Sequence, residues 1–125
     1  MCFPAKEVTI KDESNIEEYD IELSCGAGVL SIAQEHDCIV FTVEEATHLH
    51  NFLSKIERVT KDVDKPERLY YVDRINMISI MLRGGIISIS EPDDVVNMTL
   101  AEATNLHKEL GDMLELIKQS ETKAG

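Results

Sequence analysis

The chain has 125 residues, 43% of them hydrophobic, and a formal net charge of −12 at pH 7. This composition favours one soluble globular domain, and no apolar run is long enough to span a membrane. The acidity argues against direct nucleic-acid binding, because such proteins use Lys and Arg to replace phosphate counterions. Three irregularly spaced cysteines and an N-terminus without signal-peptide features favour reduced thiols and a cytoplasmic location.

The first elements in chain order are predicted strands. Val8 and Ile10 alternate with polar neighbours, which indicates a short strand. Further strands are predicted over 21–25, 29–33 and 38–41, with a glycine-rich turn at 26–28. In each strand the apolar residues recur at every second position, so one side of the resulting sheet faces a core.

A helix follows these strands. Thr42 and Glu45 form a Thr-x-x-Glu capping box, in which each side chain bonds the backbone amide of the other residue. The apolar stripe of this helix is Ala46, Leu49, Leu53 and Ile56. The sequence therefore predicts a helix over 43–57 that packs on the sheet.

The remaining elements repeat the first ones at a constant offset of 57 residues. Ile21 to Leu53 aligns without a gap to Ile78 to Leu110, and twelve of these 33 pairs are identical. The second copy predicts strands over 77–82, 86–89 and 95–98, a turn at Gly84-Gly85, a capping box at Thr99 and Glu102, and a helix over 100–118. Leu69 and Tyr71 indicate a further strand before this copy. A repeat of this kind determines architecture better than chemistry.

These patterns predict repeat 1 over 1–57, a connector over 58–67, repeat 2 over 68–120 and a frayed tail over 121–125. The fold class is α+β, a tandem duplication of an antiparallel β-β-β(-β)-α unit that forms one compact domain. We expect the halves to pair about a pseudo-two-fold axis. The order of elements resembles the β-β-β-β-α unit of the Pur-alpha and Whirly nucleic-acid-binding families. The resemblance covers topology alone, since their sequence motifs and their basic, aromatic sheet surface are missing.

Candidate chemical groups are few. His50 and His107 occupy equivalent positions at the edge of each helix stripe, and a symmetric pairing would bring them together as a metal or proton site. Two histidines alone make a poor metal site, so the favoured interpretation is a pair of packed boundary residues. His36-Asp37-Cys38 is interpreted as a loop. No catalytic, phosphate-binding or metal-binding motif occurs, so we expect no enzymatic activity, cofactor or metal.

Two surfaces are candidates for binding a protein partner. The first is acidic and contains no Lys or Arg: Asp12, Glu13, Glu17, Glu18, Asp20 and Glu22. It either mimics a row of phosphates or only keeps the chain soluble. The second is apolar, because repeat 2 places Met77 and Met81 where repeat 1 has Asp20 and Ser24, with Ile86 nearby and Arg83 beside them. Exposed apolar patches often mark protein contacts.

The sequence therefore predicts a non-enzymatic acidic module that regulates or inhibits a protein partner with a basic surface, of the kind that phages and mobile elements use against host proteins. Two alternatives remain open. One is a nucleic-acid-binding module with Pur/Whirly-like topology, for which Arg68, Arg74 and Arg83 are the starting points. The other is a small-ligand-binding or sequestering protein with a site between the repeats. A homodimer through the outer sheet face of repeat 2 is also left open.

Overall fold

The structure is a computed structural model, and it describes residues 6–10, 20–26 and 29–124. The first repeat forms a four-stranded antiparallel sheet in the order β1-β2-β3-β4, followed by a helix. Its elements are β1 (Lys6–Ile10), β2 (Ile21–Gly26), β3 (Val29–Gln34), β4 (Asp37–Phe41) and α1 (Val43–Lys61). The predicted turn at 26–28 lies mostly outside the described residues.

The second repeat has the same topology, with the sheet order β5-β6-β7-β8. A short 3-10 turn, η1 (Pro66–Arg68), precedes β5 (Tyr70–Ile75), β6 (Ile78–Arg83), β7 (Ile86–Ser90), β8 (Val95–Thr99) and α2 (Leu100–Ala124). The predicted Gly84-Gly85 turn is confirmed, since both glycines have positive φ angles and Arg83 pairs directly with Ile86. The α+β tandem duplication is therefore confirmed, with a fourth strand in each repeat.

The fourth strands, β1 and β5, explain why the gapless repeat begins only at Ile21. Ile10 pairs with Ile21, and Ile75 pairs with Ile78, so the two strands hold equivalent places beside β2 and β6. Residues 11–20 join the first pair, whereas Asn76 and Met77 alone join the second. This difference in connection length changes the offset of the first strand and removes it from the alignment.

Both predicted capping boxes are confirmed. The Thr42 amide donates to Glu45 Oε1 at 2.9 Å, and the Glu45 amide donates to Thr42 Oγ1 at 3.1 Å. The same pair of bonds joins Thr99 and Glu102, at 2.9 Å and 3.1 Å. Each helix therefore begins where the sequence indicates, because its first free amides are bonded locally.

The predicted helix ends are wrong. Helix α1 runs to Lys61 and not to 57, because Val59 packs against the core and Thr60 bonds back to the carbonyl of Ile56 at 2.8 Å. The connector therefore begins after residue 61. Helix α2 runs to Ala124 and not to 118, and so includes most of the predicted frayed tail. Residues 112–124 contain no Pro or Gly, so nothing in the sequence terminates this helix earlier.

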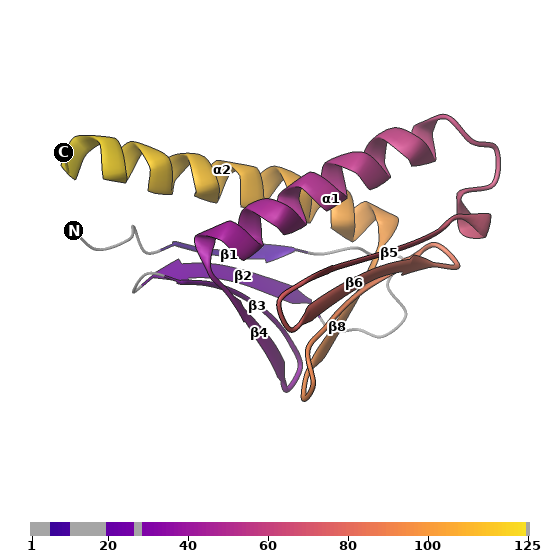
Figure 1. The fold of residues 1–125 in the computed structure, drawn as a ribbon, viewed down its shortest axis with the longest axis horizontal. Coiled ribbons are helices and arrows are strands. Elements are labelled where there is room, and N and C mark those ends of the chain that lie inside the picture. The colour runs from indigo at the N-terminus through magenta and orange to yellow at the C-terminus, as the bar shows by residue number, and fades with distance from the viewer. Residues whose placement is uncertain (1–5, 11–19, 27–28, 125) are drawn as a thin grey trace.

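The two helices lie over both sheets and cross each other (Figure 1). Helix α1 contacts β3 and β4 of its own sheet and then β5 of the other, while α2 contacts β7 and β8 and then β1 and β2. One hydrophobic core contains residues of both repeats, including the predicted stripe of the first helix and the equivalent residues of the second. Each repeat therefore completes the core of the other. The pseudo-two-fold arrangement of the halves stays a prediction.

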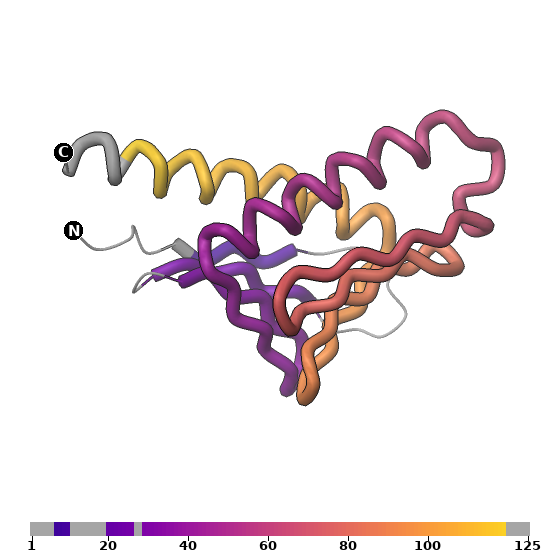
Figure 2. The backbone as a smooth tube through the Cα atoms, viewed as in Figure 1, coloured from indigo at the N-terminus to yellow at the C-terminus, as the bar shows by residue number. Residues whose placement is uncertain are grey.

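The two sheets also approach each other directly, along β4 and β8. The β3–β4 and β7–β8 hairpins converge at one end of the molecule (Figure 2). The buried Gln34 side chain donates to the Asn97 carbonyl at 2.8 Å and accepts from the Asn97 amide at 3.0 Å. This pair of bonds ties the end of β3 to the middle of β8 and fixes the hairpin tips side by side.

Candidate functional site

Of the predicted acidic surface, only Asp20 and Glu22 lie within the described residues. Asp12, Glu13, Glu17 and Glu18 lie outside the described residues. Asp20 and Glu22 are exposed, and Glu22 projects from the outer face of the first sheet, the face turned away from the helices. Glu7 of β1 lies on the same outer face, opposite Ser24. The visible part of this surface is therefore acidic, as the sequence indicates.

The acidic surface extends much further than residues 12–22. The chain contains no Lys or Arg between Lys11 and Lys55, and none between Arg83 and Lys108. In the fold these two base-free stretches come together, because they form β2, β3 and β4 in one sheet and β7 and β8 in the other. The described positive charges lie elsewhere, in β1 (Lys6), the C-terminal half of α1, the connector, β5, the end of β6 and α2.

The hairpin tips, residues 35–37 and 91–94, form the centre of this base-free region. Asp94 Oδ1 of one tip accepts from the Cys38 amide beside the other tip at 3.4 Å. Partial burial raises the pKa of the Glu91 carboxyl, and the neighbouring carboxylates of Asp94 and Asp93 raise it further. Carboxylates of the second repeat thus crowd together beside Asp37 of the first. Neither repeat shows this cluster by itself in the sequence.

Of the two methionines predicted to lie on the outer sheet face, only the half-buried Met81 lies there. Met77 is 61% exposed but lies in the β5–β6 turn, because β6 begins at Ile78. It therefore sits at the opposite end of β6 from Arg83. Met81 projects from the outer face of the second sheet, between Val72 and Ser88.

The apolar surface on this sheet contains two β5 residues that the sequence did not single out, together with the expected Ile86. Tyr70 and Val72 of β5 are 62% and 58% exposed, and Ile86 of β7 is 40% exposed. Tyr70 pairs with Arg83, and Arg83 pairs with Ile86, so these side chains form one row across the outer face. We call Tyr70, Val72, Met81 and Ile86 the outer strip. Tyr70 and Val72 were not predicted from the sequence, because residues 70–75 alternate between exposed and half-buried positions. None of these residues is fully buried.

The two equivalent histidines do meet. The rings of His50 and His107 stack where α1 and α2 cross, with centroids 4.4 Å apart and an angle of 28° between the planes. His107 Nδ1 also lies 2.9 Å from Glu57 Oε2 of α1. Burial lowers the pKa of His50, and the nearby His107 lowers it further. A third histidine, His48, bonds Asp73 of β5 through Nε2 at 2.8 Å.

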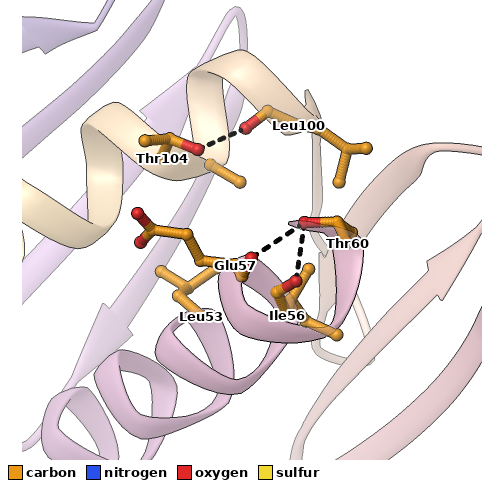
Figure 3. Close-up of a pocket in the computed structure, with 7 residues that line it drawn as sticks. Leu53, Ile56, Glu57, Thr60, Leu100 and Thr104 are labelled. Carbon is orange, nitrogen blue, oxygen red and sulfur yellow. Dashed lines mark hydrogen bonds between the residues drawn. The ribbon is translucent and has the colours of Figure 1, made fainter. Parts of the chain in front are cut away.

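The two sides of the helix crossing differ in shape. On one side, the Glu57 side chain of α1 extends toward Thr104 of α2 (Figure 3), and the pocket there measures only ≈ 20 Å³. On the other side, an open groove of ≈ 380 Å³ runs between the beginning of α1 and the second half of α2. Its walls include Val43, His50, Gly111 and Leu114.

The described residues offer no metal centre. Among residues 6–10, 20–26 and 29–124, no three His, Cys, Asp or Glu side chains are placed to hold a metal ion. His36 lies in the exposed β3–β4 turn, 3.9 Å from Glu35, and Cys38 is an exposed free thiol in β4. The interpretation of residues 36–38 as a loop holds only for His36, because Asp37 and Cys38 belong to β4.

Comparison of the chain with protein-family models and with curated proteins finds no match. Within the part of the chain that the structure describes, neither helix has the length and hydrophobicity that crossing a membrane requires.

Proposed function

We propose that the protein is a non-enzymatic binding module that regulates or inhibits a protein partner with a basic surface. The observation that carries this proposal is the segregation of charge. The base-free strands of both repeats meet at the hairpin tips, where Asp37, Glu91, Asp93 and Asp94 lie in a region without Lys or Arg. The partner would bind there.

The physical argument concerns repulsion between like charges. Carboxylates crowded on one surface repel one another. The pKa of Glu91 is raised first by partial burial and then by the neighbouring carboxylates of Asp94 and Asp93. Lys and Arg from a partner relieve the repulsion and make charge-assisted hydrogen bonds. Opposite potentials also accelerate association and select the partner. Free cysteines at Cys25 and Cys38 suit a reducing compartment such as the cytoplasm.

The experiment is affinity capture with two charge-matched variants. The tip variant carries Asp37→Asn, Asp93→Asn and Asp94→Asn, which preserve side-chain shape. The control carries Asp62→Asn, Asp64→Asn and Glu67→Gln, which neutralise three exposed carboxylates in the connector region. Both variants lose three negative charges, so a general effect of net charge is the same in each.

We expect wild type and control to capture the same basic protein, and the tip variant to lose it. Binding should weaken steeply with salt, because screening reduces attraction between exposed charges. Equal capture by the tip variant and the control would overturn the proposal, and so would a captured partner that is itself acidic.

A nucleic-acid-binding function is the second candidate, and one observation favours it. The outer face of the second sheet carries an exposed tyrosine, Tyr70, directly opposite Arg83, with Arg74 farther along β5. Aromatic and basic side chains on a sheet are the usual elements of a single-stranded nucleic-acid platform.

A titration with single-stranded oligonucleotides at two salt concentrations tests this second candidate. Binding by wild type that weakens with salt and is lost in Tyr70→Ala would favour nucleic acid over the acidic module. If wild type does not bind the oligonucleotides at low salt, the nucleic-acid-binding function is excluded. Tyr71→Phe serves as the control, because Tyr71 faces α1, where Lys55 Nζ lies 4.8 Å from its ring centroid.

A further inference from the structure

The open groove beside His50 has a filled counterpart within the same molecule. At the offset of 57 residues, His50 corresponds to His107, and Leu114 corresponds to Glu57. On the filled side, the Glu57 carboxylate bonds His107 at 2.9 Å and only ≈ 20 Å³ remains. On the open side the equivalent position is apolar, and the groove measures ≈ 380 Å³. The chain thus supplies a carboxylate to one histidine and not to the other.

Gly111 contributes to the difference between the two sides. Its counterpart in α1 is Ser54, and a Cβ atom at position 111 would lie 2.9 Å from His50 Nε2. The missing side chain lets the His50 ring lie against α2. Within the described residues, the only partner of the His50 ring is His107, through the stack at 4.4 Å. The wall of the groove therefore includes an imidazole to which no carboxylate is bonded among the described residues.

The rest of the groove is mostly apolar, with Thr47 and two charges of opposite sign. Val43, Leu114 and Ile117 supply the apolar area, and Glu115 and Lys118 line the rim. A volume of this size is within the range of small-molecule sites, which are mostly apolar with a few polar groups that orient the ligand. Burial and the nearby His107 lower the pKa of His50, which favours the neutral ring. A neutral imidazole can donate one ring N–H to an acceptor.

We propose that this groove binds a small monocarboxylate with a short alkyl chain, whose carboxylate bonds His50 and whose chain lies on Val43, Leu114 and Ile117. The Glu57–His107 pair is the internal model for the polar contact. The alkyl chain gains the burial that an apolar wall offers. This site is separate from the hairpin tips and does not depend on the proposed protein partner.

Sodium octanoate is the probe, and thermal unfolding is the first measurement. A ligand that binds only the folded state raises Tm, by about 4 °C when its concentration reaches about ten times Kd. We expect a saturable rise for wild type with octanoate. 1-Octanol has the same alkyl chain without the carboxylate, and we expect a clearly smaller rise with it. No rise with octanoate, or an equal rise with both compounds, would overturn the proposal.

Leu114→Glu locates the site. It supplies a carboxylate at the position equivalent to Glu57, so we expect it to abolish the response to octanoate. Leu116→Glu is the matched control, because it adds the same charge two residues away at a side chain that is 37% exposed and does not line the groove. We expect this control to respond as wild type does. A full octanoate response in Leu114→Glu would contradict the proposed site.

Histidine NMR of wild type keeps the test independent of how the variants fold. Octanoate should shift the imidazole signals of His50 more than those of His36 and His48, with the His50 signals assigned from a His50→Gln variant. Shifts confined to His36 or His48 would place the ligand elsewhere and refute the inference.

Discussion

Ile32 in the first sheet and Ile89 in the second occupy equivalent positions, and both are almost fully buried, at 1% and 0% exposure. One layer outward, Ser24 of the first sheet corresponds to Met81 of the second. Inner positions are constrained because every side chain there packs against several others. Outer positions are not constrained in this way, and at these positions the two repeats have diverged in charge and hydrophobicity. Surface positions can therefore serve recognition without disturbing the core.

The largest expected effect tests whether the interiors are equivalent. Ile32→Ala and Ile89→Ala each remove a buried side chain, and each should lower the free energy of unfolding by about 2–5 kcal/mol. Urea denaturation of the two variants measures both losses. A loss below about 1 kcal/mol in either variant would mean that the two interiors are not packed alike.

The second-largest expected effect is a loss of stability when a helix N-cap is removed. Thr42→Ala and Thr99→Ala each remove one side of a capping box and should cost about 1 kcal/mol. We expect the larger loss at Thr99, because its partner Glu102 is 1% exposed and the bond that is removed lies in a buried site. Thermal unfolding compares the two. A larger loss at Thr42 would show that burial does not control the strength of these caps.

The outer faces should tolerate exchange between the repeats. Met81→Ser gives the second sheet the residue found in the first, where the Ser24 and Ser31 hydroxyls are 2.8 Å apart. The free energy of unfolding should change by about 0.5 kcal/mol or less, as at most surface sites. If urea denaturation shows a loss as large as that of Ile89→Ala, the outer strip belongs to the core and is not a free surface.

The smallest expected effect concerns Glu91, whose counterpart in repeat 1 is Gln34. Its pKa is raised in the folded state, so folding binds a proton in the window between 4.5 and the folded pKa. This carboxyl therefore lowers stability as pH rises through that window. Glu91→Gln should raise Tm slightly at pH 7 and lose that advantage near pH 4.

The pKa of Glu45 is shifted in the opposite direction to that of Glu91, so Glu45 serves as a control. Burial alone would raise the pKa of Glu45, but its bonds with Thr42 and Asn76 outweigh burial and lower the pKa below 4.5. Its contribution is present above pH 4.5 and is lost as pH falls through the folded pKa. Glu45→Gln should therefore lower Tm at pH 7. A Glu91→Gln variant that also lowers Tm at pH 7 would contradict the crowding of carboxylates at the tips.

Local signals made most of the fold predictable. The Gly84-Gly85 turn and the Thr42–Glu45 box depend on neighbouring residues, and the repeat doubled the evidence for each. The fourth strands were harder, because unequal connections shift β1 and β5 out of the common offset. The end of α2 could not be placed because nothing in its last turns breaks a helix.

The candidate sites were less predictable, because they depend on contacts between distant residues. The approach of His50 to His107 follows from the repeat, and sequence reasoning could anticipate it. The approach of Asp94 to Cys38 depends on how two separate hairpins pack, and no local pattern encodes it. Tyr70 and Val72 lie on an edge strand without a buried residue, so the usual alternation was too weak to place them on a surface.

One measurement tests the central claim most directly, namely that the acidic hairpin tips form the binding surface. The captured partner is titrated into isotopically labelled protein, and the perturbed backbone amides are mapped by NMR. We predict that the largest shifts fall within residues 35–38 and 91–95 and disappear at high salt. Shifts confined to the outer strip, or to α1 and α2, would contradict the account.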